Sequence, residues 1–111
     1  MNWIELNSVH QLAEIKEFSK SRVQVIFKHS TRCSLSTIAK NRLERIEQPE
    51  STDFYFLDLI QFRSLSNKIA EDFAIPHESP QILLIKNMEC VYEESHNGIN
   101  MAEIAEQVNS N

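Results

Sequence analysis

The sequence predicts an α/β fold in which a mixed sheet of four to five strands is covered by helices on both faces. Three observations lead to this prediction. Segments rich in β-branched and aromatic residues alternate with segments whose apolar residues recur at helical spacing. Strands separated by a helix favour parallel pairing, because the helix returns the chain to the same edge of the sheet. Only the short turn Asn87–Glu89 separates the last two strands, so they are expected to form an antiparallel hairpin.

Nine elements are expected, and the polar pair Asn7 and Ser8 offers an N-cap to the first helix. In chain order they are a short edge strand at Trp3–Leu6, a helix from Val9 to about Lys20, a strand at Val23–Lys28, a helix ending near Gln48, a strand at Asp53–Leu59, a helix from Phe62 to Phe73, a strand at Gln81–Lys86, a strand at Cys90–Glu93 and a helix from Met101 to Val108. The buried faces of the first two helices are expected to consist of Val9, Leu12, Ile15 and Phe18, and of Leu35, Ile38, Ala39, Leu43 and Ile46.

The composition bounds the classes of function. A chain of 111 residues is expected to form one domain, residues 1–111, with a core that needs neither disulfides nor metal. The formal net charge of −5 argues against nonspecific binding of nucleic acid, which needs a basic surface. The sequence offers no signal peptide and no apolar run long enough to span a membrane, so we expect a cytoplasmic protein. Its two cysteines are then expected to be free thiols.

Several kinds of site are disfavoured by residues that the sequence lacks. Gly98 is the only glycine, which excludes phosphate-binding loops and dinucleotide fingerprints because both need several glycines. There is no C-x-x-C pair and no H-E-x-x-H motif, and the four histidines are scattered along the chain. No metal site is therefore expected.

Cys33 is the candidate nucleophile. It lies where the strand that begins at Val23 turns into a helix, and the N–H groups and positive dipole end of a helix N-terminus stabilise a thiolate. The residues before it are polar, which indicates an exposed turn rather than core. We expect Lys28, His29 and Arg32 to add positive charge around the sulfur.

Two other side chains bear on how Cys33 reacts. Ser36 follows one helical turn later, and its hydroxyl is placed either to donate a hydrogen bond to the sulfur or to face solvent. A serine cannot displace a thiol bound to Cys33, so release requires another thiol. Cys90 is expected at the far end of the sheet, beside the hairpin turn, as a packing or surface residue rather than that thiol.

The motif Cys33-Ser34-Leu35-Ser36 has the spacing of the thioredoxin C-x-x-C site with serine in place of the second cysteine. The longer string from Phe27 to Ser36, FKHSTRCSLS, resembles that of the YtxJ-type monothiol bacilliredoxins, and the likeness spans the chain. That family often has proline directly after the cysteine, where this chain has Ser34. The resemblance implies a thioredoxin-like fold, whose order of strands and helices matches the one expected above.

The resemblance also implies a set of site residues. In this fold the proline that opens the strand before the hairpin follows a cis peptide bond and lies opposite the reactive cysteine, and Ser79-Pro80 occupies the matching position. Cys33 is then the catalytic residue. The residues expected to bind the substrate or its thiol are Arg32, Ser34, Ser36, Ser79, Pro80 and Gly98.

The function implied by the resemblance is thiol–disulfide exchange. The substrates would be proteins whose cysteines are capped by bacillithiol, the thiol that some bacteria use in place of glutathione. Bacillithiol would be the co-substrate, with no further cofactor, no nucleic acid and no membrane as partner, and we expect a monomer. Two alternatives remain: a redox-inactive thioredoxin-fold module that binds proteins, and an iron–sulfur carrier like the monothiol glutaredoxins, whose C-G-F-S motif differs here at Ser34 and Leu35.

Overall fold

The computed structural model describes residues 1–110 and contains one five-stranded sheet with the strand order β1-β3-β2-β4-β5. The strands β1, β3 and β2 are parallel, while β4 runs antiparallel to β2 and β5 antiparallel to β4. The elements are β1 (Trp3–Glu5), α1 (Val9–Phe18), β2 (Val23–His29), α2 (Ser34–Glu44), β3 (Thr52–Asp58), α3 (Arg63–Phe73), β4 (Gln81–Lys86), β5 (Glu89–Ser95), the 3₁₀ turn η1 (His96–Gly98) and α4 (Met101–Asn109).

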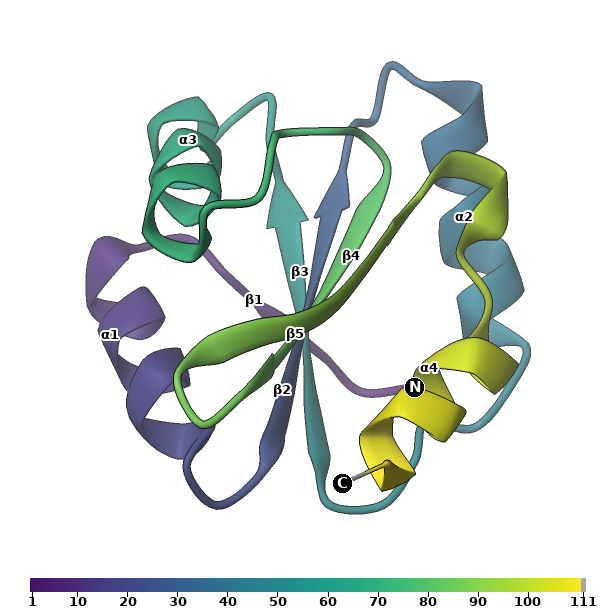
Figure 1. Cartoon of the computed structure of the whole chain (residues 1–111). Coiled ribbons are helices and arrows are strands. Elements are labelled where there is room, and N and C mark those ends of the chain that lie inside the picture. Colours follow the sequence, from purple (N-terminus) through teal and green to yellow (C-terminus); the bar gives the residue numbers. More distant parts are fainter. Residues whose placement is uncertain (111) are drawn as a thin grey trace.

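Helices cover both faces of the sheet, as the sequence predicts. Helices α1 and α3 lie on one face, and α2 and α4 lie on the other (Figure 1). Each face has its own apolar core. On the α1 and α3 side, Leu12, Ile15, Leu65 and Ile69 pack against Ile26 and other sheet residues; the second core brings together Val25, Phe27, Phe54, Ile82, Leu84, Ala39, Leu43, Met101 and Ile104. The predicted mixed sheet with helices on both faces is confirmed.

The pairing register brings several strand ends to one end of the sheet. His29, the last residue of β2, pairs with Asp58 at the end of β3, and Lys28 pairs with Gln81 at the start of β4. The end of β5 meets the same place, because Ser95 pairs with Gln81. We call this the upper end of the sheet, after its position in Figure 1. The loops before α2, before β4 and after β5 therefore meet above the sheet.

Two helices are shorter than predicted. Helix α2 ends at Glu44 rather than near Gln48, with Arg45 as its C-cap. Helix α1 ends at Phe18, where Ser19 turns away and binds the hairpin turn: its carbonyl accepts the N–H of Asn87 at 2.8 Å and its hydroxyl accepts the N–H of Met88 at 2.8 Å.

The predicted buried faces of these two helices were partly wrong. Only Leu12 and Ile15 are buried in α1, while α2 buries its positions 36, 39 and 43. Side chains at these spacings share one face of a helix. The apolar residues that lie outside these faces and are exposed are Val9, Phe18, Leu35, Ile38 and Ile46.

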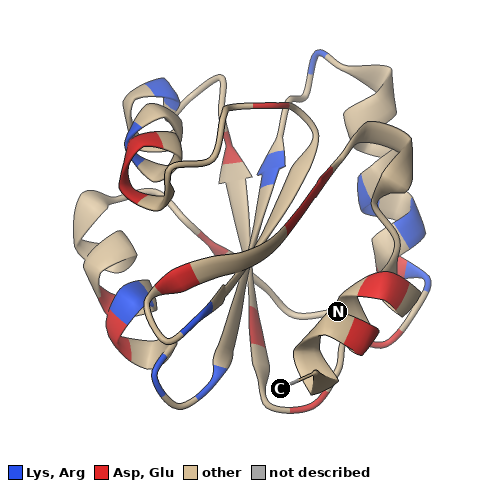
Figure 2. Cartoon of the chain, viewed as in Figure 1, with Lys and Arg blue, Asp and Glu red and all other residues tan. Residues whose placement is uncertain are grey.

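Charged residues are spread over the surface, although α4 carries acidic residues and no basic one (Figure 2). Among residues 1–110, no helix is long and apolar enough to cross a membrane.

Candidate active site

Cys33 is the N-cap residue of α2, at the upper end of the sheet. Its extended backbone (φ −111°, ψ 118°) makes the turn, its N–H donates to the Ser30 carbonyl at 3.1 Å, and its own carbonyl accepts the N–H of Thr37 at 3.2 Å. The side chain makes no capping hydrogen bond and is half-buried. Cys33 therefore lies at the N-terminus of α2, as the sequence predicts.

Of the three basic residues expected around Cys33, only Arg32 is exposed beside it. Arg32 and Ser34, on either side of the cysteine, are both exposed. Lys28 and His29 are buried instead, because β2 is covered on both faces and its last residues remain within the sheet. Burial, together with the nearby charge of Lys40, lowers the pKa of His29, so that its ring is neutral at pH 7. The prediction that Lys28 and His29 surround the sulfur with positive charge was wrong.

Ser36 binds the turn rather than the sulfur. Its side chain is fully buried, and its oxygen lies 2.7 Å from Nδ1 of His29 while accepting the N–H of Ser30 at 3.0 Å. One hydrogen bond thus joins the Ser36 hydroxyl to Nδ1 of the neutral His29 ring. In residues 1–110 no hydrogen bond joins Ser36 to Cys33. Neither the expected bond to the sulfur nor a solvated hydroxyl is found.

The hydrogen bonds of Ser36 hold three segments together. They connect the first turn of α2 to the end of β2, and through the Ser30 N–H to the turn that carries Cys33. The sequence analysis missed this role of His29. A signal was available in the sequence. His29 lies two residues after Phe27 and so shares its face of β2, and a buried imidazole needs a polar partner.

The loop before β4 brings Pro80 to the same end of the sheet. The Ser79–Pro80 peptide bond is cis, as predicted, and Pro80 is buried. The Pro80 carbonyl accepts the N–H of His96 at 3.1 Å, which joins this loop to the turn η1. The hydroxyl oxygen of Ser79 is buried and has no hydrogen-bond partner among residues 1–110. A polar atom left in this state is suited to bond an incoming backbone or ligand.

Gly98 lies in η1, which Arg42 holds against α2 by donating to the carbonyls of Asn97 at 3.3 Å and Ile99 at 3.1 Å. A Cβ atom on Gly98 would come within 2.5 Å of the side-chain carboxyl carbon of Glu94. The absence of a side chain thus lets η1 pack closely against β5. Cys33, Ser36, Ser79, Pro80 and Gly98 all belong to segments that meet at the upper end of the sheet.

Cys90 lies at the other end. It pairs with Ile85 beside the β4–β5 turn, packs against the core on the α1 and α3 side, and donates its S–H to the Tyr92 carbonyl at 3.3 Å. Burial raises the pKa of the Cys90 thiol. The predicted position of Cys90, far from the candidate nucleophile, is confirmed.

We therefore expect Cys33 to react with iodoacetamide about ten times faster than Cys90 at pH 7, because only the thiolate is nucleophilic and burial holds Cys90 in the thiol form. Timed labelling followed by peptide mass spectrometry measures both rates in one sample. Labelling in denaturant is the control, since the two rates should then converge. Equal rates in the folded protein would contradict the prediction.

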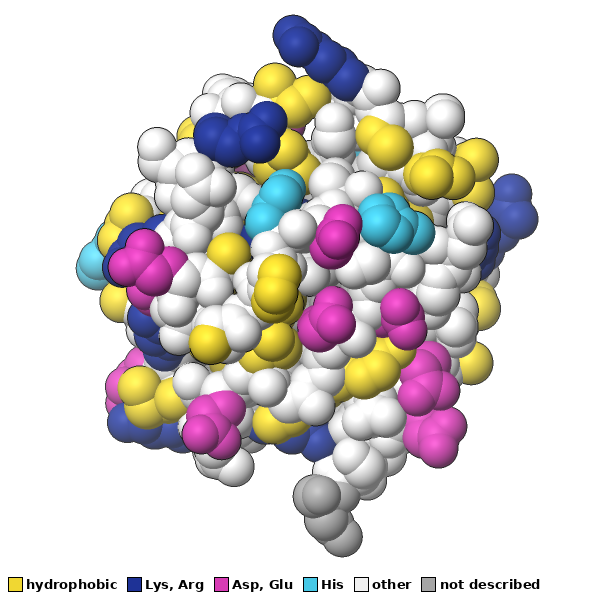
Figure 3. Space-filling model, turned by 45° about the horizontal axis from the view of Figure 1, so that its top comes forward, with side chains coloured by type: hydrophobic (Ala, Val, Ile, Leu, Met, Phe, Trp, Pro, Cys, Tyr) yellow, Lys and Arg dark blue, Asp and Glu magenta, His cyan; other side chains and the backbone are white. Residues whose placement is uncertain are grey.

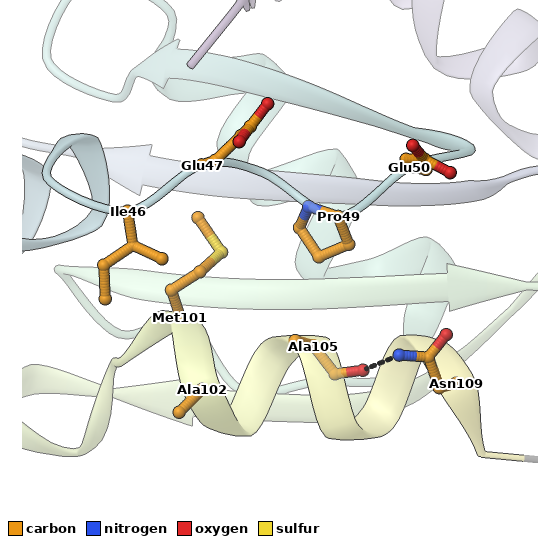
Figure 4. Close-up of a pocket in the computed structure, with 8 residues that line it drawn as sticks. All are labelled: Ile46, Glu47, Pro49, Glu50, Met101, Ala102, Ala105 and Asn109. Atoms are coloured by element: carbon orange, nitrogen blue, oxygen red, sulfur yellow. Dashed lines mark hydrogen bonds between the residues drawn. The ribbon is translucent and has the colours of Figure 1, made fainter.

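A surface cavity of about 450 Å³ lies away from these residues. It is open between the segment after α2 and the helix α4 (Figure 4). Its lining is Ile46, Glu47, Pro49, Glu50, Met101, Ala102, Ala105 and Asn109. None of the predicted site residues contributes to it. Within residues 1–110 there is also no cluster of three or more His, Cys, Asp or Glu side chains placed to hold a metal ion.

Comparisons with known proteins agree with this geometry. A family model described as monothiol bacilliredoxin BrxC matches residues 4–104. A solved protein described as a proposed oxidoreductase with a thioredoxin fold is 31% identical over 94% of this chain and 91% of that one, with a TM-score of 0.82. Schistosoma mansoni thioredoxin is 22% identical (96% and 93% covered, TM-score 0.71), and the long form of spinach chloroplast thioredoxin f is 16% identical (98% and 88% covered, TM-score 0.77). The predicted thioredoxin-like fold is confirmed.

Proposed function

Because this chain belongs to the monothiol bacilliredoxin family, we propose that Cys33 removes bacillithiol from protein mixed disulfides. The family and the fold support a thiol oxidoreductase in the wider sense. The observation that carries the narrower proposal is the isolation of Cys33: it stands at a helix N-terminus with a buried serine one turn away, and the other cysteine lies at the opposite end of the sheet.

In the proposed reaction, the Cys33 thiolate attacks the bacillithiol sulfur of the mixed disulfide. A new disulfide forms between Cys33 and bacillithiol, the old one breaks, and the protein substrate leaves as a thiolate. A second thiol then attacks the adduct and restores the Cys33 thiolate. Neither Ser36 nor Cys90 can take this step, so the second thiol comes from outside the chain.

Features around Cys33 support a protein substrate. Leu35 and Ile38 follow Cys33 on the outer face of α2 and are 42% and 50% exposed. Apolar side chains next to a reactive group offer a docking surface for another protein. Arg32 and Ser34 are exposed beside the sulfur, and the unpartnered Ser79 hydroxyl is available for a hydrogen bond to the substrate.

The proposal also names the co-substrate, the oligomeric state and the compartment. Bacillithiol is the co-substrate and no further cofactor is required. The protein acts as a monomer in the cytoplasm, where cellular thiols are kept reduced. Neither nucleic acid nor a membrane takes part.

A single-turnover experiment tests this function. Reduced protein is mixed with one equivalent of a bacillithiolated substrate protein, and intact-mass spectrometry follows both chains. We expect the substrate to lose one bacillithiol while this chain gains one, with the adduct on the peptide that contains Cys33. Turnover beyond one equivalent should begin only after an external thiol is added.

The matched control is Cys90→Ser, which removes the second thiol without touching the upper end of the sheet. It should transfer and release the cap as the wild type does. Persistence of the cap on the substrate would refute the proposed function. Multiple turnovers without added thiol would refute the external release step.

A further inference from the structure

Lys28 is a buried ammonium at the end of β2. Its side chain is 0% exposed, on the α3 side of β2. Nζ donates to the Ser66 carbonyl at 3.1 Å and lies 3.3 Å from Nδ1 of His77. Within residues 1–110, no carboxylate forms an ion pair with it. Because a charge is costly to bury unless it is paired, this arrangement calls for an explanation beyond packing.

The contact with Lys28 fixes which nitrogen of His77 carries the proton. A protonated ammonium has no lone pair, so Nδ1 must accept. The Ser66 hydroxyl lies 3.3 Å from the same nitrogen. Desolvation and the charges of Lys28 and Arg63 lower the pKa of His77, and they outweigh the charge of Glu78, which acts to raise it. Because the pKa is lowered, the ring is neutral at pH 7. A neutral ring that accepts at Nδ1 carries its proton at Nε2.

His77 lies in the loop before β4, at the upper end of the sheet, and Nδ1 is the ring nitrogen that contacts the buried Lys28. The ring is half-buried. No hydrogen bond within residues 1–110 uses Nε2. His77 stands three residues before Pro80, and histidine side chains are visible on the surface that comes forward in Figure 3.

The loop that carries His77 is held in shape by Gln81. The amide nitrogen of this buried side chain donates to the Pro76 carbonyl at 3.1 Å, and its oxygen accepts the N–H of Glu78 at 3.4 Å. His77 therefore has a defined position relative to Pro80, with a buried positive charge behind its ring.

We propose that His77 Nε2–H, backed by Lys28, binds a carboxylate of the small thiol whose disulfide Cys33 attacks. This inference rests on the proposed function and adds the recognition of the small thiol. His77 is the binding residue and Lys28 is a positioning residue that acts through it. A neutral donor with a buried cation behind it attracts an anion while keeping its proton. The chain's net charge of −5 would by itself repel anions. A preference for an anionic ligand therefore requires a local hydrogen-bond donor with positive charge nearby.

Three symmetrical disulfides of similar size test the proposal: 3,3′-dithiodipropionate, which is anionic, bis(2-hydroxyethyl) disulfide, which is neutral, and cystamine, which is cationic. In each reaction the Cys33 thiolate bonds to one sulfur, the reagent's S–S bond breaks, and the other half leaves as a thiolate. Stopped reactions analysed by intact mass give the rate constants at pH 7. Each reagent is small, so a preference among them concerns the small thiol and not an acidic protein surface.

We expect the wild type to react about tenfold faster with the anionic than with the neutral reagent, the size of one hydrogen bond to a charged group. Lys28→Met and His77→Gln should each bring this ratio close to one. His77→Gln leaves the net charge at pH 7 unchanged, so its effect cannot come from the overall field. Lys86→Met is the matched control: Lys86 also donates to two main-chain carbonyls, of Gln107 and Ser110, but at the other end of β4, and its loss should leave the ratio unchanged.

A second measurement separates positioning from mere folding. Imidazole ¹⁵N chemical shifts should show His77 as the Nε2–H tautomer, and Lys28→Met should raise its pKa because one of the charges that lower it is gone. If the wild type reacts equally with the anionic and neutral reagents, or if both variants keep the preference, the proposal is overturned while the function of Cys33 stands. If Cys33 reacts with none of the three, both fail.

Discussion

Replacing Cys33 by serine abolishes transfer of the bacillithiol cap, with an expected loss of at least about 10³-fold. A serine hydroxyl becomes a nucleophile only beside a general base. The imidazole closest in sequence, His29, is buried and its Nδ1 is already hydrogen-bonded to Ser36, so it is not available as a base for the residue at position 33. The measurement is the rate at which the mass of a capped substrate protein decreases, with and without added thiol.

The control for Cys33→Ser is Ser34→Ala, which changes the next, exposed residue and should preserve more than half of the rate. A comparable loss in Ser34→Ala would assign the effect to the conformation of the turn. Full activity in Cys33→Ser would show that the reaction does not pass through this sulfur. Circular dichroism of each variant checks that the fold is retained.

Lys28→Met stabilises the folded protein by about 2 kcal/mol at pH 7. Burial lowers the pKa of Lys28 to about 8, from an ordinary value of about 10.4. This difference corresponds to roughly 3 kcal/mol against the charged form in the folded state. Methionine fills a similar volume without a charge, and about 1 kcal/mol of the gain is offset by the lost hydrogen bond to Ser66.

The pH dependence gives the same prediction a second, independent signature. Between about pH 8 and 10.4 the unfolded chain holds the Lys28 proton and the folded chain releases it, so the free energy of unfolding rises with pH. Below pH 8 both states are protonated and the cost of burial is fully expressed. The advantage of Lys28→Met should therefore be largest at pH 7 and vanish near pH 10.

Denaturant titrations of the wild type and Lys28→Met at several pH values measure this difference. The raised pKa values of Cys90, Tyr55 and Tyr92 lower the free energy of unfolding as pH rises, in both proteins. The difference between the free energies of unfolding of the two proteins at each pH removes this shared effect. A variant that is less stable than the wild type at every pH would show that the ammonium is a net stabiliser.

The sequence was sufficient for the order of elements and for the position of Cys33 at the start of α2, because both depend on local signals. Alternating strand and helix patterns identified the elements, and β4 has the predicted bounds Gln81–Lys86. The strand-to-helix turn at Cys33 follows from its neighbours. The cis bond before Pro80 came from the family resemblance alone, since no local pattern specifies it.

The contacts of side chains within the site could not be predicted in the same way. Whether Ser36 faces the sulfur or the sheet depends on how α2 is rotated against β2, and the exposed Leu35 and Ile38 suggested a different buried face. The position of Lys28 depends on α3 and the loop of His77, which are 38 and 49 residues away. Periodicity within one segment contains no information on such distant partners.

The buried Ser36 has an evolutionary consequence. A single base change in a serine codon can produce cysteine. At this position the new sulfur would be shielded from solvent and would lie beside the Nδ1 atom of His29. It would stand three residues from Cys33 at the start of one helix, a separation compatible with a disulfide. Such a lineage could expel the cap without help, exchanging dependence on a cellular thiol for dependence on a reductase. One-thiol and two-thiol descendants of this scaffold thus differ by a single atom.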